Sequence, residues 1–145
     1  MFRFTIRDVL WLTALVALAP PAIAQEVNPA AALAGEWEIV EMIFRGKVQD
    51  FSGKPGGWIW FRKGEFAIAY STREGPATRP CTIRPREIDI QPDPFARNER
   101  VIKAHYDLQG ESLRIVWRDD YGDRPMSFDA QKDSHLTLYV LKKSK

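Results

Sequence analysis

The sequence predicts an all-β domain, an up-and-down antiparallel meander that closes into a barrel of about eight strands. Nearly every segment after residue 35 is short, rich in aromatic and β-branched residues, and bounded by turn residues such as Gly and Pro. Apolar and polar residues alternate with a period of two late in the chain, as in strands with one buried face. Links such as "LQGES" fit hairpins, and closing a meander removes exposed edges, which favours a barrel over a sandwich.

Residues 1–24 are typical of a secretory signal peptide and precede the predicted fold. A basic start is followed by an apolar run from Val9 to Ala19, and small residues lead to a cleavage site between Ala24 and Gln25. The run is short for a hydrocarbon core of about 30 Å. We therefore expect an exported protein, periplasmic or secreted. The alternative is an uncleaved N-terminal anchor, which is the only membrane attachment that the sequence indicates.

The rest of the chain fits one domain, with a linker and helical turn at 25–32 and the barrel at 33–145. Its formal charge is close to neutral: the whole chain carries +2, and the leader holds two arginines and one aspartate. A nucleic-acid partner would need a basic surface, so we expect none. Cys81 is the chain's single cysteine and cannot form an intrachain disulfide. We interpret it as a small buried core residue.

The elements follow in order along the chain. The segment "NPAAALAG" (28–35) predicts a short helical turn that ends at Gly35. Strands are predicted at 36–44, 57–61, 65–71, 78–84, 86–91, 100–108, 112–118, 125–130 and 135–142.

The alternation predicts which side chains share the buried face of the late strands. The buried sets are Ile102, Ala104, Tyr106 and Leu108, then Leu113, Ile115 and Trp117, and finally Leu136, Leu138 and Val140. In the last strand, His135, Thr137 and Tyr139 are expected on the wet face.

"LAGEWEIV" opens the first strand and predicts how one end of the barrel is closed. Trp37 is its first inward residue, and Ile39 and Ile43 follow at the same parity. A large indole here would plug the closed end of the barrel, while Gly35 lets the chain cross beneath it. We expect Arg124 to brace this end against Trp37.

Several motifs along the chain resemble one family. They are Leu-x-Gly-x-Trp at Leu33, Gly35 and Trp37, then Ile88-Asp89, then Tyr106, Leu108, Gly110 and Leu113, and finally Arg124, Pro125 and Phe128. Together they resemble the lipocalin-like domain of unknown function that is expanded in planctomycete bacteria, over residues 33 to 141. The resemblance implies a calycin-like barrel and no established activity. That family often has a Cys where Val116 stands, so no thiol-based role is carried over.

No catalytic or metal-binding pattern stands out. His105 and His135 lie on polar parities and are interpreted as exposed, and Cys81 has no local signature of a nucleophile. The carboxylates of "RDDYGDRP" (118–125) lack the spacing of a calcium loop. We therefore predict a protein that is not an enzyme and has neither metal nor cofactor, with a hydrolase as a distant alternative.

Two functions remain, and the sequence favours the first. The first is a surface-interaction or structural domain with a filled core, acting on a partner outside the cytoplasm. The second is a barrel that binds a small apolar ligand, with candidate wall residues Trp58, Trp60, Tyr106 and Trp117. Inward Ala67, Ala69 and Ala104 would leave such a cavity open.

The segment "GWIWF" (57–61) is apolar at both parities, so one of its faces must point outward. That face is either covered by the N-terminal helical turn or exposed for a partner. Covering by the helical turn is favoured.

Overall fold

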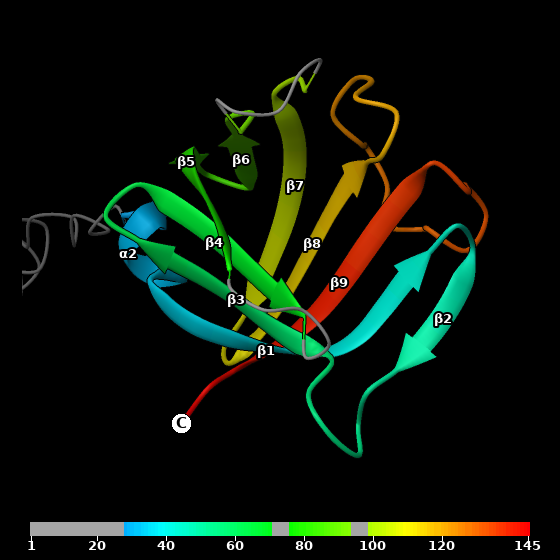
Figure 1. Cartoon of the computed structure of the whole chain (residues 1–145), viewed down its shortest axis with the longest axis horizontal. Helices are drawn as coiled ribbons and strands as arrows, with labels where there is room; N and C mark the ends of the chain where they lie inside the picture. Colours follow the sequence, from blue (N-terminus) through cyan, green and yellow to red (C-terminus); the bar gives the residue numbers. More distant parts are fainter. Residues whose placement is uncertain (1–27, 71–75, 94–98) are drawn as a thin grey trace, which may run out of the picture.

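The computed structural model describes residues 28–70, 76–93 and 99–145 (Figure 1). The predicted signal peptide, the cleavage site between Ala24 and Gln25, and the start of the linker lie outside the described residues. Within these ranges, no helix is long and apolar enough to cross a membrane.

In the described part of the chain, one short helix precedes nine strands. The helix is α2 (Pro29–Leu33), and the strands are β1 (Gly35–Phe44), β2 (Lys47–Asp50), β3 (Gly57–Arg62), β4 (Glu65–Tyr70), β5 (Ala77–Arg84), β6 (Glu87–Ile90), β7 (Ile102–Gln109), β8 (Ser112–Arg118) and β9 (Leu136–Lys143). The sequence did not predict β2. The strand predicted at 125–130 is wrong, because that segment belongs to the connection between β8 and β9.

The strands close into a barrel. All pairings are antiparallel, and the order β1-β3-β4-β5-β6-β7-β8-β9 is closed by the pairing of β1 with β9. Eight strands therefore form the barrel, and β2 is an extra strand on the second half of β1 (Figure 1). The predicted all-β closed meander with a short helix is confirmed.

A β-bulge divides β1 into two halves that face different surroundings. The register with β9 shifts between Ile39 and Glu41, which inserts one extra residue into β1. Trp37 and Ile39 point inward before the bulge, whereas Ile43 after it packs on the outside of the barrel. The prediction that Ile43 shares the parity of Trp37 was therefore wrong, because the extra residue reverses the alternation.

The closed half of the barrel holds the main core. Leu33 of α2 enters it, and inward side chains from all eight barrel strands complete it: Trp37, Ile39, Ile59, Phe61, Phe66, Cys81, Ile88, Ile90, Ala104, Tyr106, Leu113, Ile115, Tyr139 and Leu141. The predicted buried faces of β7 and β8 are confirmed by these residues.

A second core lies outside the barrel, beneath the connection between β8 and β9. It contains Ile43, Val116, Ala130, Leu136 and Leu138, with Phe128 and Val140 packed against it. As a result β9 is buried on both faces, and Thr137 and Tyr139 are 2% exposed. The prediction that these two residues lie on a wet face was wrong, because the long connection covers the face that the alternation assigned to the core.

Candidate functional site

The open end of the barrel contains a cavity of about 510 Å³. Its walls come from β1, β2, β4, β8 and β9, from the loop between β2 and β3, and from Asp119 directly after β8. The lining residues are Met42, Phe44, Gln49, Phe51, Gly56, Tyr70, Trp117, Asp119, Thr137 and Tyr139. The bulge in β1 places Met42 and Phe44 in this set, because it turns them inward after Ile39.

Aromatic rings separate the cavity from the packed core. The Trp117 and Tyr139 rings contact each other with centroids 4.8 Å apart and planes inclined at 38°. Trp117 also meets Phe66 of the core edge to face, with centroids 6.4 Å apart. Such contacts add to the energy of area burial and fix the orientation of the rings. The half-buried Trp117 ring therefore forms the cavity floor, and the buried Tyr139 ring packs against it.

Two polar pairs lie in the same cavity. The hydroxyls of Tyr70 and Tyr139 are 2.5 Å apart and hydrogen-bonded. The Thr137 hydroxyl donates to Asp119, with its Oγ1 2.8 Å from Oδ1 and 2.9 Å from Oδ2. Burial raises the pKa of Tyr139 well above its usual value, and the neighbouring Tyr70 and the negative charge of Asp119 raise it further. Tyr139 is therefore a neutral phenol at physiological pH.

The closed end of the barrel is plugged by Trp37, which is 1% exposed. Its indole Nε1 donates to the Leu33 carbonyl at 2.8 Å. Gly35 has a φ of +113°, which favours glycine, and a Cβ there would lie 3.1 Å from Lys143 Nζ. The Lys143 ammonium lies 4.4 Å from the Trp37 ring centroid and donates to the carbonyl of Ala34.

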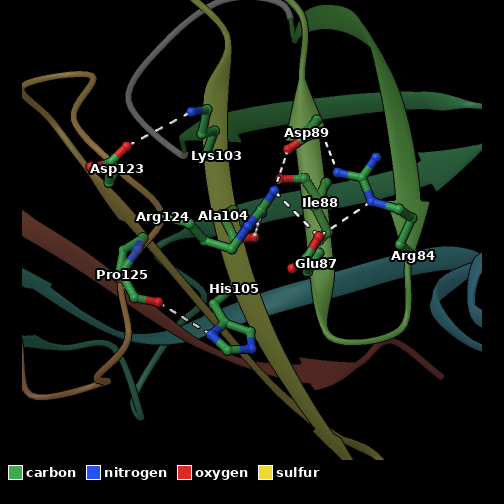
Figure 2. Close-up of polar contacts among 10 residues, drawn as sticks. All are labelled: Arg84, Glu87, Ile88, Asp89, Lys103, Ala104, His105, Asp123, Arg124 and Pro125. Carbon is green, nitrogen blue, oxygen red and sulfur yellow. Dashed lines mark hydrogen bonds and ion pairs between the residues drawn. The ribbon is translucent and has the colours of Figure 1, made fainter.

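Arg124 does not lie at this plug, so the prediction that it braces Trp37 was wrong. Figure 2 shows its guanidinium on the outer surface of β6 and β7. Its Nη2 lies 2.6 Å from Asp89 Oδ1, and its Nη1 donates to the carbonyls of Ile88 and Ala104. Lys143 takes the place over Trp37 because β9 ends beside the start of β1.

Asp89 is the centre of this outer cluster. Its Oδ2 also accepts a hydrogen bond from Arg84 (Figure 2). Burial by itself would raise the pKa of Asp89, but the hydrogen bonds and charges of Arg124 and Arg84 outweigh it and lower that pKa. The cluster therefore fastens the β8–β9 connection to the outside of the barrel.

The structure separates the four predicted ligand-wall residues. Trp117 lines the open-end cavity. Tyr106 lies in the closed half of the core, and it also borders a shallow hollow beside Pro29 of α2. Trp58 and Trp60 alternate with the buried Ile59 and Phe61 on β3, so they face outward.

The outward face of β3 meets small residues on β4. Trp58 and Trp60 pair with Ala69 and Ala67, so these two alanines also face outward and leave no space in the interior. Trp60 lines an outer groove of about 350 Å³, which Ala67 and Thr78 also border. The prediction that the helical turn covers this face was wrong, because α2 packs beside β5.

The groups considered for catalysis do not come together. His135 is exposed, as predicted. His105 was also predicted to be exposed but is half-buried, and its Nδ1 lies 3.2 Å from the carbonyl oxygen of Pro125. Cys81 is buried, as predicted, and burial followed by the charge of Glu65 raises the pKa of its thiol to about 11. Over the described ranges, no group of three or more His, Cys, Asp or Glu residues could hold a metal ion.

Sequence reasoning missed most of the cavity. Met42 and Phe44 were hidden by the bulge, Phe51 and Gly56 lie in a loop, and Asp119 was considered only as a ligand of a calcium loop. A usable signal was that three aromatic residues lie at or next to the last residue of a strand: Phe44 in β1, Tyr70 in β4 and Trp117 in β8. The cavity as it stands can bury an apolar body and offers hydroxyls, an amide and one carboxylate for orientation.

Comparison with known proteins identifies the fold and no family. No protein-family model and no curated protein matches the chain. A lipocalin-like protein from Bacteroides uniformis resembles it with a TM-score of 0.51 and 18% identity, over 78% of this chain and 99% of that one. An uncharacterized protein from Bacteroides eggerthii has a TM-score of 0.48 and 18% identity, over 77% of this chain and 99% of that one. The first likeness, together with the observed strand order, shows that this chain has the fold of a lipocalin-like eight-stranded barrel.

Proposed function

We propose that the protein is a non-catalytic binding module whose open-end cavity holds one small, largely apolar ligand. The observation that carries the proposal is the aromatic-lined cavity of about 510 Å³ above a filled closed half. Small-molecule sites span about 300–1,000 Å³ and combine apolar walls with a few polar groups. The sequence favoured a barrel with a filled core. We rank that function second, because only one half of the interior is packed.

The walls suit an apolar body for a physical reason. Burying apolar ligand surface contributes about 25 cal/mol per Å². The half-buried Trp117 ring is already held by its contact with the buried Tyr139 ring, so little side-chain entropy is lost when a ligand packs on Trp117. We expect moderate affinity and moderate chemical selectivity.

A dye titration tests the proposal. N-phenyl-1-naphthylamine is neutral and apolar, and its emission rises in an apolar site, so we expect saturable binding of one dye per chain. Met42→Trp should weaken that binding at least about tenfold, because the larger side chain occupies the cavity. Val48→Trp is the matched control, since Val48 is 47% exposed on β2 and does not line the cavity. Absence of saturable binding to the folded protein, or equal binding by both variants, would contradict the proposal.

A second candidate function is recognition of an extracytoplasmic protein through the outer face of β3 and β4. The half-buried Trp58 and Trp60 and the groove of about 350 Å³ favour it. Affinity capture from the exported fraction of the producing cell tests it, with Trp60→Asp compared with wild type. A partner retained equally by both would contradict this candidate.

We also propose membership in the planctomycete-type family that the motifs resemble. The support is that two motifs of the resemblance meet: Asp89 of Ile88-Asp89 pairs with Arg124 of the Arg124-Pro125 motif at 2.6 Å. A profile built from sequences of that family tests it, and a failure to align Asp89 and Arg124 with the family's own motifs would contradict it.

Export remains a proposal that rests on the leader sequence. N-terminal sequencing of the native protein should begin at Gln25. An intact Met1 in the membrane fraction would instead support the anchor. The proposal includes no enzymatic activity, cofactor or nucleic-acid partner.

A further inference from the structure

We infer that the ligand of the open-end cavity is an organic ammonium compound, with an apolar body on the aromatic floor and a positively charged head at Asp119. This inference rests on the proposed ligand-binding function and specifies its ligand class. Among the lining residues in the described part of the chain, Asp119 is the only one with a charged side chain. The cavity therefore has a net negative charge at one side of an apolar surface.

The fold places the carboxylate beside the aromatic floor. Trp117 and Thr137 are opposite each other in the β8–β9 ladder, and Tyr139 follows Thr137 on the same face. Asp119 directly follows Arg118, the last residue of β8, and its backbone N–H donates to the carbonyl of His135 at 2.9 Å. The hydroxyl of Thr137 then fixes the carboxylate from within the cavity. The carboxylate is thus held in place before any ligand arrives.

The carboxylate retains capacity to accept a further donor. Two carboxylate oxygens offer about four acceptor positions, and one hydroxyl occupies only part of them. The neighbouring cation Arg45 lies over the Phe44 ring, 5.0 Å from its centroid, and borders a separate hollow with Asp119. Among the ion pairs of the described residues, none joins Arg45 to Asp119.

The field of Asp119 reaches the cavity floor. Its negative charge is one of the causes that raise the pKa of Tyr139, so it opposes a negative charge at that depth. The same field favours a cation, and aromatic faces attract a cation as well. An anionic amphiphile such as a fatty acid would meet repulsion here, whereas an ammonium compound would gain a charge-assisted hydrogen bond.

The test compares three probes with one chain length and different heads: octylammonium, octanol and octanoate, each displacing N-phenyl-1-naphthylamine from the full chain. We expect octylammonium to bind about fivefold more tightly than octanol, which is the largest gain that an exposed ion pair usually gives. Octanoate should bind most weakly. The advantage of octylammonium should shrink as salt is raised.

Asp119→Asn is the decisive variant, because it keeps the shape and an acceptor for Thr137 but removes the charge. We expect it to remove the preference, so that octylammonium and octanol bind with about the same affinity. Asp123→Asn is the matched control: it removes the same charge from the same connection, at a fully exposed side chain. Equal binding of octylammonium and octanol, or an unaltered preference in Asp119→Asn, would overturn the inference while dye binding still supports the cavity. If neither the dye nor any probe binds, the proposed function itself fails.

Discussion

The two ends of the barrel use similar aromatic side chains for different purposes. At the closed end, the Trp37 indole donates to a carbonyl of the chain, and the Lys143 ammonium lies over its ring. At the open end, Trp117 and Tyr139 contact each other, and a cavity of about 510 Å³ lies above them. The closed end thus supplies its own apolar and cationic partners, whereas the open end leaves space where such partners could bind.

The difference arises from local features of the chain. The preceding helix α2 brings Leu33 into the closed half, and the last residues of β9 bring Lys143. At the other end, the bulge after Ile39 turns β1 away toward β2, and the rings of Phe44 and Phe51 border the cavity without filling it. The described residues thus close one end with Leu33 and Trp37, which are both fully buried, and leave a cavity at the other.

The largest expected effect is at the plug. Trp37→Ala should lower the free energy of unfolding by about 3–5 kcal/mol, because it removes a fully buried indole and leaves a void. Urea unfolding of the domain measures the loss. A loss below about 1 kcal/mol would mean that the closed end does not depend on its indole.

Trp117→Ala should cost less, about 2 kcal/mol, because one side of this half-buried ring already faces the cavity. The same unfolding experiment compares the two variants directly. Equal losses would contradict the contrast between the two ends, since they would require Trp117 to be packed on all sides.

The architecture was largely predictable from sequence, for reasons visible in particular strands. The alternation in β7 and β8 placed Ala104, Tyr106, Leu113 and Ile115 in the core, because one side of each strand faces the barrel interior. Leu-x-Gly-x-Trp located the buried Trp37 because its tryptophan is the first inward residue of β1.

The candidate site was mostly not predictable, because its geometry depends on features without a period. One extra residue in β1 exchanges the faces of Met42 and Ile43. The β8–β9 connection covers Leu136 and Leu138 from outside, which releases Thr137 and Tyr139 to face inward. The alternation of apolar and polar residues within one strand shows neither a bulge nor the path of a loop that packs on it from elsewhere in the chain.

A third prediction concerns how the β8–β9 connection is fastened to the outside of the barrel. Asp89→Asn should destabilise the fold by about 1 kcal/mol at pH 7, because the ion pairs that fasten the β8–β9 connection weaken. The pKa of Asp89 is lowered in the folded state, so this stabilisation is present above the unfolded value and is lost as the pH falls through the folded value. Unfolding measured from pH 7 down to the acid range should therefore show the two proteins converging. A constant difference at all pH values would contradict this assignment.

The smallest expected effect is at the cation of the closed end. Lys143→Met should cost about 0.5 kcal/mol, because methionine keeps an apolar chain over the Trp37 ring and removes the ammonium, with its exposed contact to that ring and its hydrogen bond to the Ala34 carbonyl. Lys143→Arg should retain most of the stability, and paired urea curves with equal slopes resolve the difference. A loss above about 2 kcal/mol would mean that Lys143 belongs to the plug itself. No loss at all would show that the ammonium gains nothing from the indole or the Ala34 carbonyl, and an ammonium ligand at the open end would then depend on Asp119 alone.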